Sequence, residues 1–324
     1  MSTDLNPASG SVSIMKRKLI IPVLSLIYLL LAYVTTGIRN DHFLLVAIVN
    51  GSFFISKLTR RFITGFSIFV IYWILFDSMK LWPNWSFSEV DILPLYNLEK
   101  SWFGIMHEGV LLTPNEFFIL HKTTFLDILS ASFYLCWVPL PLIFAFYLYN
   151  KRKDLFIRFS LAFFFVNILG FIIYYVHPAA PPWYYAEFGN TLNTATKSNA
   201  AGLLRFDEYF GINLFADLYS KGSNVFAAMP SLHSAYPLIG FIYAARLSKK
   251  YFMYVFGIVS IGIWFSAIYL YHHYTLDIVV GISCAVIGVY ILENYILSST
   301  RSRNWLQNFE KAITAASDQE KTVI

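Results

Sequence analysis

Eight stretches of mostly apolar residues divide this chain, at roughly 19–37, 42–57, 62–79, 124–149, 155–176, 231–248, 251–271 and 276–297. A helix needs about 20 such residues to cross the hydrocarbon core of a bilayer. Only 13% of the residues are charged, whereas a soluble domain carries about a quarter. We therefore predict an all-α, polytopic integral membrane bundle of about eight transmembrane helices. A soluble enzyme, a disordered protein and a secreted disulfide scaffold are excluded.

The distribution of basic residues predicts the orientation of these helices, because cytoplasmic loops carry an excess of Lys and Arg. With a cytoplasmic N-terminus, 17 of the 24 Lys and Arg residues fall inside and 7 outside. The second run is the weakest, since Asn50 and Gly51 interrupt it, but omitting it would place the cluster 16–18 outside. The first run is long enough to span, so we interpret it as a retained helix and not as a removed signal peptide.

Three segments are predicted from this topology. Residues 1–123 hold N-terminal membrane helices and an outer interfacial loop, residues 124–297 form a catalytic transmembrane core, and residues 298–324 form a polar, loosely ordered cytosolic tail. Two long outer connections, 80–123 and 177–230, contain amphipathic pieces such as Leu203 to Leu218. We expect these pieces to be helices that lie in the outer interface.

The histidines are distributed unevenly under this topology. All seven fall in an outer loop or at the outer end of a helix: His42, His107, His121, His177, His233, His272 and His273. A preference of histidine for membrane interfaces would explain some of these positions, but it would not favour one face. The outer face is therefore the place to look for chemistry.

The junction of the last two apolar runs carries an acid–base pair. His273 and Asp277 are four residues apart, which places them on one helix face, one turn apart. A carboxylate that accepts a hydrogen bond from one imidazole nitrogen leaves the other nitrogen free to attack or to take a proton. The structural alternative is that Asp277 is an acid favoured by the helix dipole at a helix start.

A second polar group starts the sixth run, in the order Pro230, Ser231, Leu232, His233. The unpaired backbone amides at such a helix start bind anions, and a histidine two residues after the serine adds a proton donor. The structural alternative is a capped helix with an interfacial histidine. His177, followed by prolines at the end of the fifth run, is a candidate substrate contact or part of a structural turn.

Together these residues predict two histidines, a carboxylate and an anion-binding helix start on one face of the membrane. That combination suits phosphoryl or phosphodiester transfer through a phosphohistidine. No Cys/His spacing suggests zinc and no P-loop is present, so we predict neither a metal nor another cofactor. Cys136 and Cys284 lie inside apolar runs and are not expected to form a disulfide.

These residues resemble two sequence blocks of the type 2 phosphatidic acid phosphatase superfamily. Its block Pro-Ser-x-His is matched at 230–233, and its block Ser-Arg-x5-His-x3-Asp is matched from Ser266 to Asp277, with Ala267 in place of the arginine. The stretches 179–184 and 226–234, and more weakly 98–104, resemble the branch that contains inositol phosphorylceramide synthases. The resemblance covers about half of the chain, from the fifth apolar run onward.

The resemblance implies a role for each matched residue. His273 would be the nucleophile, oriented by Asp277, and His233 would protonate the leaving alkoxide and then deprotonate the acceptor. Ser231 and nearby amides would hold the phosphate oxygens. The family's first block, Lys-x6-Arg-Pro, has no counterpart here, so replacement cations are expected from the outer loop: Lys221, Arg205 or Lys197. Asp127 is a candidate contact to a substrate hydroxyl, or an acid that pairs locally.

The function implied by the resemblance is transfer of a phosphoinositol head group from phosphatidylinositol to ceramide or a related lipid alcohol, with release of diacylglycerol. One alternative is a lipid phosphatase with the same residues and water as the acceptor. Another is a non-catalytic channel or transporter, although the continuous spans argue against a transporter. The expected partners are these lipids and the membrane, with no nucleic acid and no obligate protein partner. The active site is expected on the non-cytoplasmic face of a bacterial inner membrane or a Golgi membrane.

Overall fold

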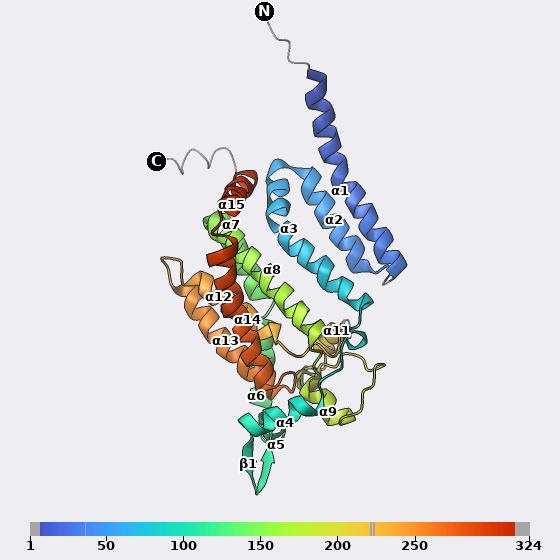
Figure 1. Ribbon diagram of the computed structural model, residues 1–324, viewed down its shortest axis with the longest axis vertical. Coiled ribbons are helices and arrows are strands. Elements are labelled where there is room, and N and C mark those ends of the chain that lie inside the picture. Colours follow the sequence, from blue (N-terminus) through green and yellow to red (C-terminus); the bar gives the residue numbers. More distant parts are fainter. Residues whose placement is uncertain (1–6, 36, 221, 223, 315–324) are drawn as a thin grey trace, which may run out of the picture. The chain divides into compact units, whose positions relative to one another are not determined.

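The computed structural model describes residues 7–314 except 36, 221 and 223, and side chains from residue 19 onward. The described chain is mostly helical, with one small hairpin (Figure 1). It divides into two compact units, Met1–Ile74 with Lys311–Ile324 and Leu75–Glu310. The second unit holds the candidate site.

The first unit contains α1 (Pro7–Thr35), α2 (Asn40–Ile55) and most of α3 (Lys57–Ser78). Helices α1 and α2 pack against each other. Asn50, which interrupts the second apolar run, donates from Nδ2 to Ser25 Oγ of α1 at 2.8 Å and to Val46 O at 2.9 Å. A polar side chain of this kind joins two apolar helices instead of breaking one.

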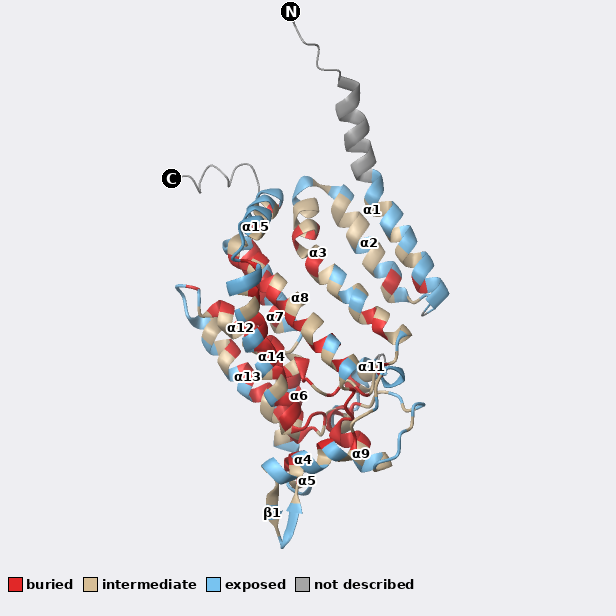
Figure 2. Cartoon of the chain, in the orientation of Figure 1, coloured by how far each residue is buried: buried red, intermediate tan, exposed pale blue. Residues whose placement is uncertain are grey.

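The second unit is built around a helical bundle. Its members are α6 (Thr124–Leu135), α7 (Pro139–Lys151), α8 (Lys153–Val176), α12 (Leu232–Ala244), α13 (Tyr251–Tyr269) and α14 (Thr275–Ile291). Helix α12 has only 13 residues, as many as α7 and one more than α6, yet it contacts α7, α8, α13 and α14. Figure 2 shows that buried residues gather where these helices face one another.

Five helical stretches in the described part of the chain are long and apolar enough to cross a membrane: Lys57–Leu81, Thr124–Lys151, Lys153–Val176, Tyr251–Tyr269 and Thr275–Ile296. Large apolar side chains point away from the bundle on these helices, as with Ile261 on α13, which is 66% exposed. Such surfaces are stable against lipid, and the chain is an integral membrane protein. The apolar stretches Leu19–Thr35 and Asn40–Ile55 are shorter, so the number of about eight spans stays a prediction.

The predicted run 124–149 is divided in the structure. Helix α6 ends at Leu135, and α7 begins at Pro139 with a second proline at 141. Proline lacks a backbone N–H and is tolerated in the first turn of a helix, so a new helix starts here instead of the old one continuing. The break lets α6 turn a buried polar face, which includes Asp127 and Ser130, toward the site.

Short elements gather at one end of the second unit (Figure 1). They are η1 (Met79–Leu81), η2 (Asn84–Ser86), α4 (Leu93–Phe103), β1 (Ile105–His107), β2 (Val110–Leu112), α5 (Pro114–Leu120), α9 (Pro182–Phe188), η3 (Ala201–Leu203), α10 (Leu204–Phe210) and α11 (Leu214–Tyr219). The antiparallel pair β1–β2 was not predicted. The expected helix from Leu203 to Leu218 is instead two helices, because Gly211 takes a left-handed conformation (φ 64°) that ends α10.

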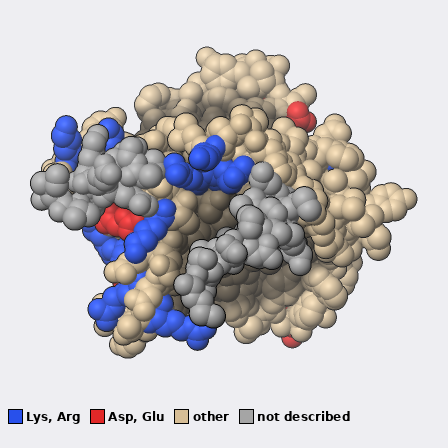
Figure 3. Space-filling model, turned by 90° about the horizontal axis from the view of Figure 1, so that it is seen from above, with Lys and Arg blue, Asp and Glu red and all other residues tan. Residues whose placement is uncertain are grey.

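The prediction of a loosely ordered tail is wrong for residues 300–313. After a π-helical turn, η4 (Leu292–Ile296), the chain forms α15 (Thr300–Ile313). Leu306, Phe309 and Ile313 recur at helical spacing, so one apolar face stabilises a helix despite the many charged residues. In the view of Figure 3, more Lys and Arg than Asp and Glu side chains are visible.

Candidate active site

Two histidines that are 40 residues apart meet at the centre of the candidate site. His233 is the second residue of α12, and His273 lies in the turn between α13 and α14. His233 Nδ1 lies 3.1 Å from His273 Nε2, within hydrogen-bond distance. The structure therefore places the two predicted catalytic imidazoles in direct contact.

Close packing of α12 on α14 holds these histidines together. The Ser231 backbone N–H donates to the Asp277 carbonyl oxygen at 2.9 Å. Gly281, one turn further along α14, lies against the Ser231 backbone, and a Cβ at this position would come within 2.2 Å of Ser231 O. Only glycine allows this approach, which is comparable in effect to the small residues at helix contacts in membranes.

Asp277 contacts both the nucleophile candidate and the start of its own helix. Its Oδ2 accepts the Tyr274 backbone N–H at 2.9 Å and lies 3.4 Å from His273 Nδ1. With the proton of His273 assigned to Nδ1 by this network, the lone pair of Nε2 faces His233. The one-turn spacing read from the sequence thus corresponds to a carboxylate beside the imidazole.

The turn that carries His273 is held by an unusual backbone arrangement. The N–H groups of His272 and His273 both donate to the Ala267 carbonyl oxygen, at 3.0 and 3.1 Å. Tyr271, just before them, has φ 66°, a left-handed conformation that costs a non-glycine residue about 1–2 kcal/mol. Ala267, which stands where the family has arginine, is fully buried, and its contribution to this turn is its backbone oxygen.

Two buried side chains, on α4 and α5, fasten the same turn. Asn115, on α5, donates from Nδ2 to Ile268 O and His273 O, at 2.9 Å each. The Glu99 carboxylate, on α4, accepts the Thr275 and Leu276 backbone N–H groups at 2.8 and 3.0 Å, which caps the start of α14. Burial raises the pKa of Glu99.

The sequence analysis missed both fastening residues. Glu99 lies in the 98–104 stretch that resembles the inositol phosphorylceramide synthase branch. The resemblance pointed to this stretch but implied no role for Glu99. Asn115 carried no signal, because an asparagine in an outer loop is ordinary and its partners lie more than 150 residues away.

Aromatic side chains surround His233. Tyr134 Oη lies 3.2 Å from His233 Nδ1, and the Trp137 ring meets the imidazole edge-on with centroids 4.5 Å apart. Trp264 donates from Nε1 to the carbonyl oxygen of Ser234, in the first turn of α12. Tyr134 and Trp137 were not recognised from the sequence, because both lie in the apolar run 124–149, where aromatic residues are common.

His272 and His273 have different surroundings. His272 stacks between Tyr134 and Tyr219, and its Nε2 lies 2.9 Å from Ala200 O. Burial lowers the pKa of His272, and burial lowers the pKa of His273 to about 4. His273 is therefore a neutral imidazole at pH 7, the form in which it can act as a nucleophile.

Ser231 lies immediately before α12 and is fully buried. Its Oγ accepts a hydrogen bond from Ser234 Oγ at 3.1 Å and caps no backbone amide of the helix. The Ser234 N–H donates to Ser231 O at 3.2 Å, whereas the N–H groups of Leu232 and His233 have no acceptor among the described residues. These two amides lie at the helix start, where a phosphate oxygen would be stabilised.

His177 lies apart from the histidine pair. It follows the last residue of α8, its side chain is 44% exposed, and its Nε2 lies 3.3 Å from Asp91 Oδ2. The adjacent backbone is tied to the segment before α12, since the Ala179 N–H donates to Phe226 O at 2.9 Å and the Ala179 carbonyl oxygen accepts from the Ala228 N–H at 3.2 Å. His177 thus borders the site and pairs with an acid that the sequence analysis did not select.

Two further candidates pair with each other. Arg205 Nε donates to Asp127 Oδ1 at 2.7 Å, and Tyr269 Oη donates to the same oxygen at 2.9 Å. This is the local pairing that the sequence allowed for Asp127. Of the other two expected cations, Lys197 is exposed in the loop between α9 and η3, and Lys221 lies outside the described residues.

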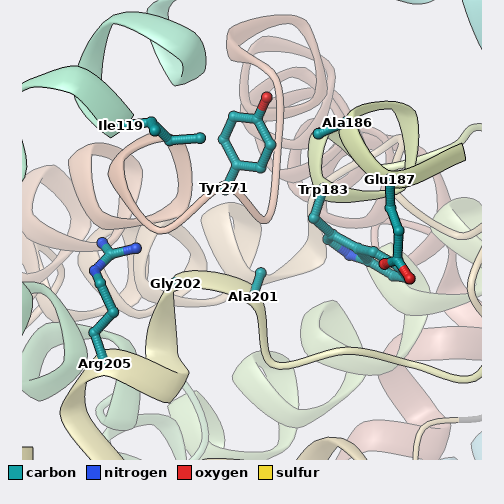
Figure 4. A pocket seen from close by; sticks show the side chains of 8 residues that line it. All are labelled: Ile119, Trp183, Ala186, Glu187, Ala201, Gly202, Arg205 and Tyr271. Carbon is teal, nitrogen blue, oxygen red and sulfur yellow. The ribbon is translucent and has the colours of Figure 1, made fainter. Parts of the chain in front are cut away.

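Arg205 also lines an open cavity of about 350 Å³ (Figure 4). Tyr271, two residues before His273, forms another wall, so the cavity adjoins the turn that carries the nucleophile candidate. Among the described residues, no group of three or more His, Cys, Asp and Glu side chains is arranged to hold a metal ion.

The buried histidine pair, its carboxylate and the adjoining helix start lie within residues 95–291, which match the model of the PAP2 superfamily. The chain belongs to this superfamily. It is 41% identical over 300 residues, 92% of its length, to the phosphoinositol dihydroceramide synthase of Bacteroides thetaiotaomicron, and covers 98% of that protein.

More distant relatives are fungal. The chain is 29% identical over 71% of its length to the inositol phosphorylceramide synthase catalytic subunit of Schizosaccharomyces pombe. It is 28% identical over 71% of its length to the inositol phosphorylceramide synthase of Candida albicans. These alignments cover 53% and 47% of the fungal proteins. No solved structure matches the chain.

Proposed function

We propose that this protein is a membrane phosphotransferase that moves a phosphoinositol head group from phosphatidylinositol to ceramide or a related lipid alcohol. The observation that carries the proposal is the histidine pair with its carboxylate, His233, His273 and Asp277, in a chain that aligns almost end to end with a phosphoinositol dihydroceramide synthase. Dihydroceramide is accordingly the first acceptor to test.

In the first step, His273 Nε2 attacks the phosphorus of phosphatidylinositol. A P–N bond forms, and the bond between phosphorus and the diacylglycerol oxygen breaks. Asp277 stabilises the positive charge that develops on the imidazole, as a carboxylate beside Nδ1 does in other histidine-based sites. His233 gives a proton to the leaving alkoxide, and diacylglycerol departs.

In the second step, the primary hydroxyl of the ceramide attacks the phosphohistidine. His233, now lacking its proton, accepts the hydroxyl proton, and the P–N bond breaks as the new P–O bond forms. The amides at the start of α12 and the buried Ser231 stabilise the non-bridging oxygens in both steps. The proton returns to His233, so the cycle closes.

The proposed topology has about eight membrane spans with both termini in the cytoplasm and the site on the opposite face. Segment 124–297 would be the catalytic core, 1–123 the N-terminal helices with an outer loop, and 298–324 a cytosolic tail. The 17 of 24 basic residues assigned to one side support this orientation. The proposed partners are the three lipids, without an obligate protein subunit.

The test uses the purified protein in nanodiscs with phosphatidylinositol, dihydroceramide and EDTA. We expect acceptor-dependent formation of the phosphoinositol ceramide and an equal amount of diacylglycerol. Inositol phosphate released without an acceptor would mean hydrolysis, and phosphate released from lipid monoesters without head-group transfer would mean a phosphatase. Either result, or complete loss of transfer in EDTA, would contradict the proposal.

A further inference from the structure

The cavity in Figure 4 has the chemistry of a polyol-binding site. Arg205 lies on one side, Glu187 with Trp183 on the other, and the ring of Tyr271 lies between the two walls. Charged groups can bind hydroxyl groups, while aromatic rings pack against the apolar face of a ring of carbon atoms. A volume of about 350 Å³ is within the usual range for a small-molecule site.

The guanidinium group of Arg205, on the cationic side of the cavity, is held in place by another residue of the protein. Arg205 uses Nε to bind Asp127 at 2.7 Å, and its side chain is only 24% exposed. No described residue accepts a hydrogen bond from its two Nη atoms, which are therefore available to a ligand. Gly202 forms the floor beside the guanidinium, and a Cβ there would come within 2.8 Å of Nη1.

The cavity is also tied to the turn that carries the nucleophile candidate. The Gly202 N–H donates to Leu270 O at 2.9 Å, and Tyr271 follows directly with its left-handed φ of 66°. Consecutive Cα atoms are about 3.8 Å apart, so the Cα atoms of Tyr271 and His273 lie within about 7.6 Å. A strained residue that presents its ring to a cavity indicates a functional constraint on that position.

We propose that this cavity is the head-group subsite, which holds the inositol ring of the donor lipid while its phosphate lies at His273. Glu187 accepts hydrogen bonds from ring hydroxyls, Arg205 donates to a hydroxyl or to the phosphodiester, and Trp183 and Tyr271 pack against the carbocycle. This assignment rests on the proposed function, because it names the subsite of the same reaction. It makes Glu187 a specificity-determining residue.

Binding tests the subsite separately from catalysis. Glycerophosphoinositol, a soluble form of the donor head group, is titrated into the full-length protein in nanodiscs and followed by calorimetry. We expect Glu187→Ala to weaken binding about tenfold and Glu187→Gln, which keeps one acceptor oxygen, to weaken it less. Glu187 is exposed, so both variants should fold, and Glu208→Ala, at an exposed acid on α10, is the matched control. Glycerophosphoglycerol, which lacks the ring, should bind at least tenfold more weakly and show no dependence on Glu187.

Steady-state kinetics provide a second test of the subsite. In the transfer assay, Glu187→Ala should raise the KM for phosphatidylinositol about tenfold and leave the KM for dihydroceramide unchanged. If both the affinity for glycerophosphoinositol and the donor KM stay within twofold of the native values, the subsite assignment is wrong although transfer itself stands. If the native protein transfers nothing but binds glycerophosphoinositol through Glu187, the proposed function is wrong and the subsite stands.

Discussion

His233 Nδ1 lies 3.1 Å from His273 Nε2, which leaves no room for a phosphorus atom between them. A nucleophile and the atom it attacks start about 3–3.5 Å apart, and a proton donor needs a further hydrogen bond of about 2.6–3.2 Å to the leaving oxygen. The two rings must therefore separate when the donor lipid enters. At this separation each imidazole occupies the space that the substrate phosphate would take.

The first prediction concerns the nucleophile. His273→Ala should reduce head-group transfer by roughly 10³-fold or more, because no covalent intermediate can form. Radiolabelled phosphatidylinositol without an acceptor should label the native protein with an acid-labile, base-stable phosphoramidate and leave the variant unlabelled. His121→Ala, at an exposed histidine, is the control. Full turnover by His273→Ala would contradict the mechanism.

The proposed role of His233 as a proton donor is tested with two donors whose leaving groups differ in their need for a proton. His233→Ala should slow transfer from phosphatidylinositol by about 10²–10⁴-fold, because the alkoxide leaves unprotonated. A p-nitrophenyl ester of inositol phosphate needs no such proton. The variant should therefore release p-nitrophenolate from this donor in a burst close to that of the native protein. An equal loss with both donors would assign His233 a purely structural role.

The lowered pKa of His273 predicts over which pH range its imidazole stays neutral. Burial lowers this pKa to about 4, so the imidazole should stay neutral from pH 8 down to about 5. NMR of ring-¹⁵N-histidine protein checks this, with the His273 signal assigned by its absence in His273→Ala. Because the unfolded chain binds this proton near pH 6.5, His273 should also reduce stability progressively as the pH falls from 6.5 toward 4. Titration of the signal near pH 6.5 would show that the site is wetter than the structure indicates.

Gly281→Ala should separate the histidines without changing them. The added methyl group would overlap Ser231 O, which lies 2.2 Å from the Cβ position, so α12 must move away from α14. We expect about 1–3 kcal/mol of destabilisation, typical of overpacking, and a large loss of kcat. Gly257→Ala is the matched control, since its Cβ would meet Phe241 at an ordinary 3.5 Å. Equal thermal melting and activity of the two variants would contradict the tight contact.

Glu99, 176 residues before Thr275 in the sequence, is predicted to stabilise the catalytic turn. Glu99→Ala removes the acceptor of two backbone amides at the start of α14, which should cost about 1–2 kcal/mol, as the loss of a helix cap does. Thermal unfolding in nanodiscs measures this, and kcat should fall while the KM for the donor changes little. Glu89→Ala, at an exposed acid just before α4, should change neither.

The sequence contained the local part of the site. The spacing from His273 to Asp277 implies a contact of one helical turn, and the structure has these groups 3.4 Å apart. The integral membrane, largely helical character followed from the apolar runs. Contacts such as those of Asn115 could not be predicted, because they join residues more than 150 positions apart through loop geometry. From the sequence, Asp127 is either a contact to a substrate hydroxyl or an acid that pairs locally. The sequence does not decide between these roles, because the pairing with Arg205 depends on where α10 lies.

Helix α12 has 13 residues and rises about 20 Å, roughly 10 Å less than the hydrocarbon thickness of a bilayer. In the proposed topology the far end of α12 lies at the cytoplasmic boundary, so the helix start that carries His233 lies about 10 Å inside the opposite boundary of the hydrocarbon. Water is scarce at this depth, whereas a ceramide is itself dissolved in the hydrocarbon through its two chains. The length of one helix would thus favour a lipid alcohol over water as the acceptor.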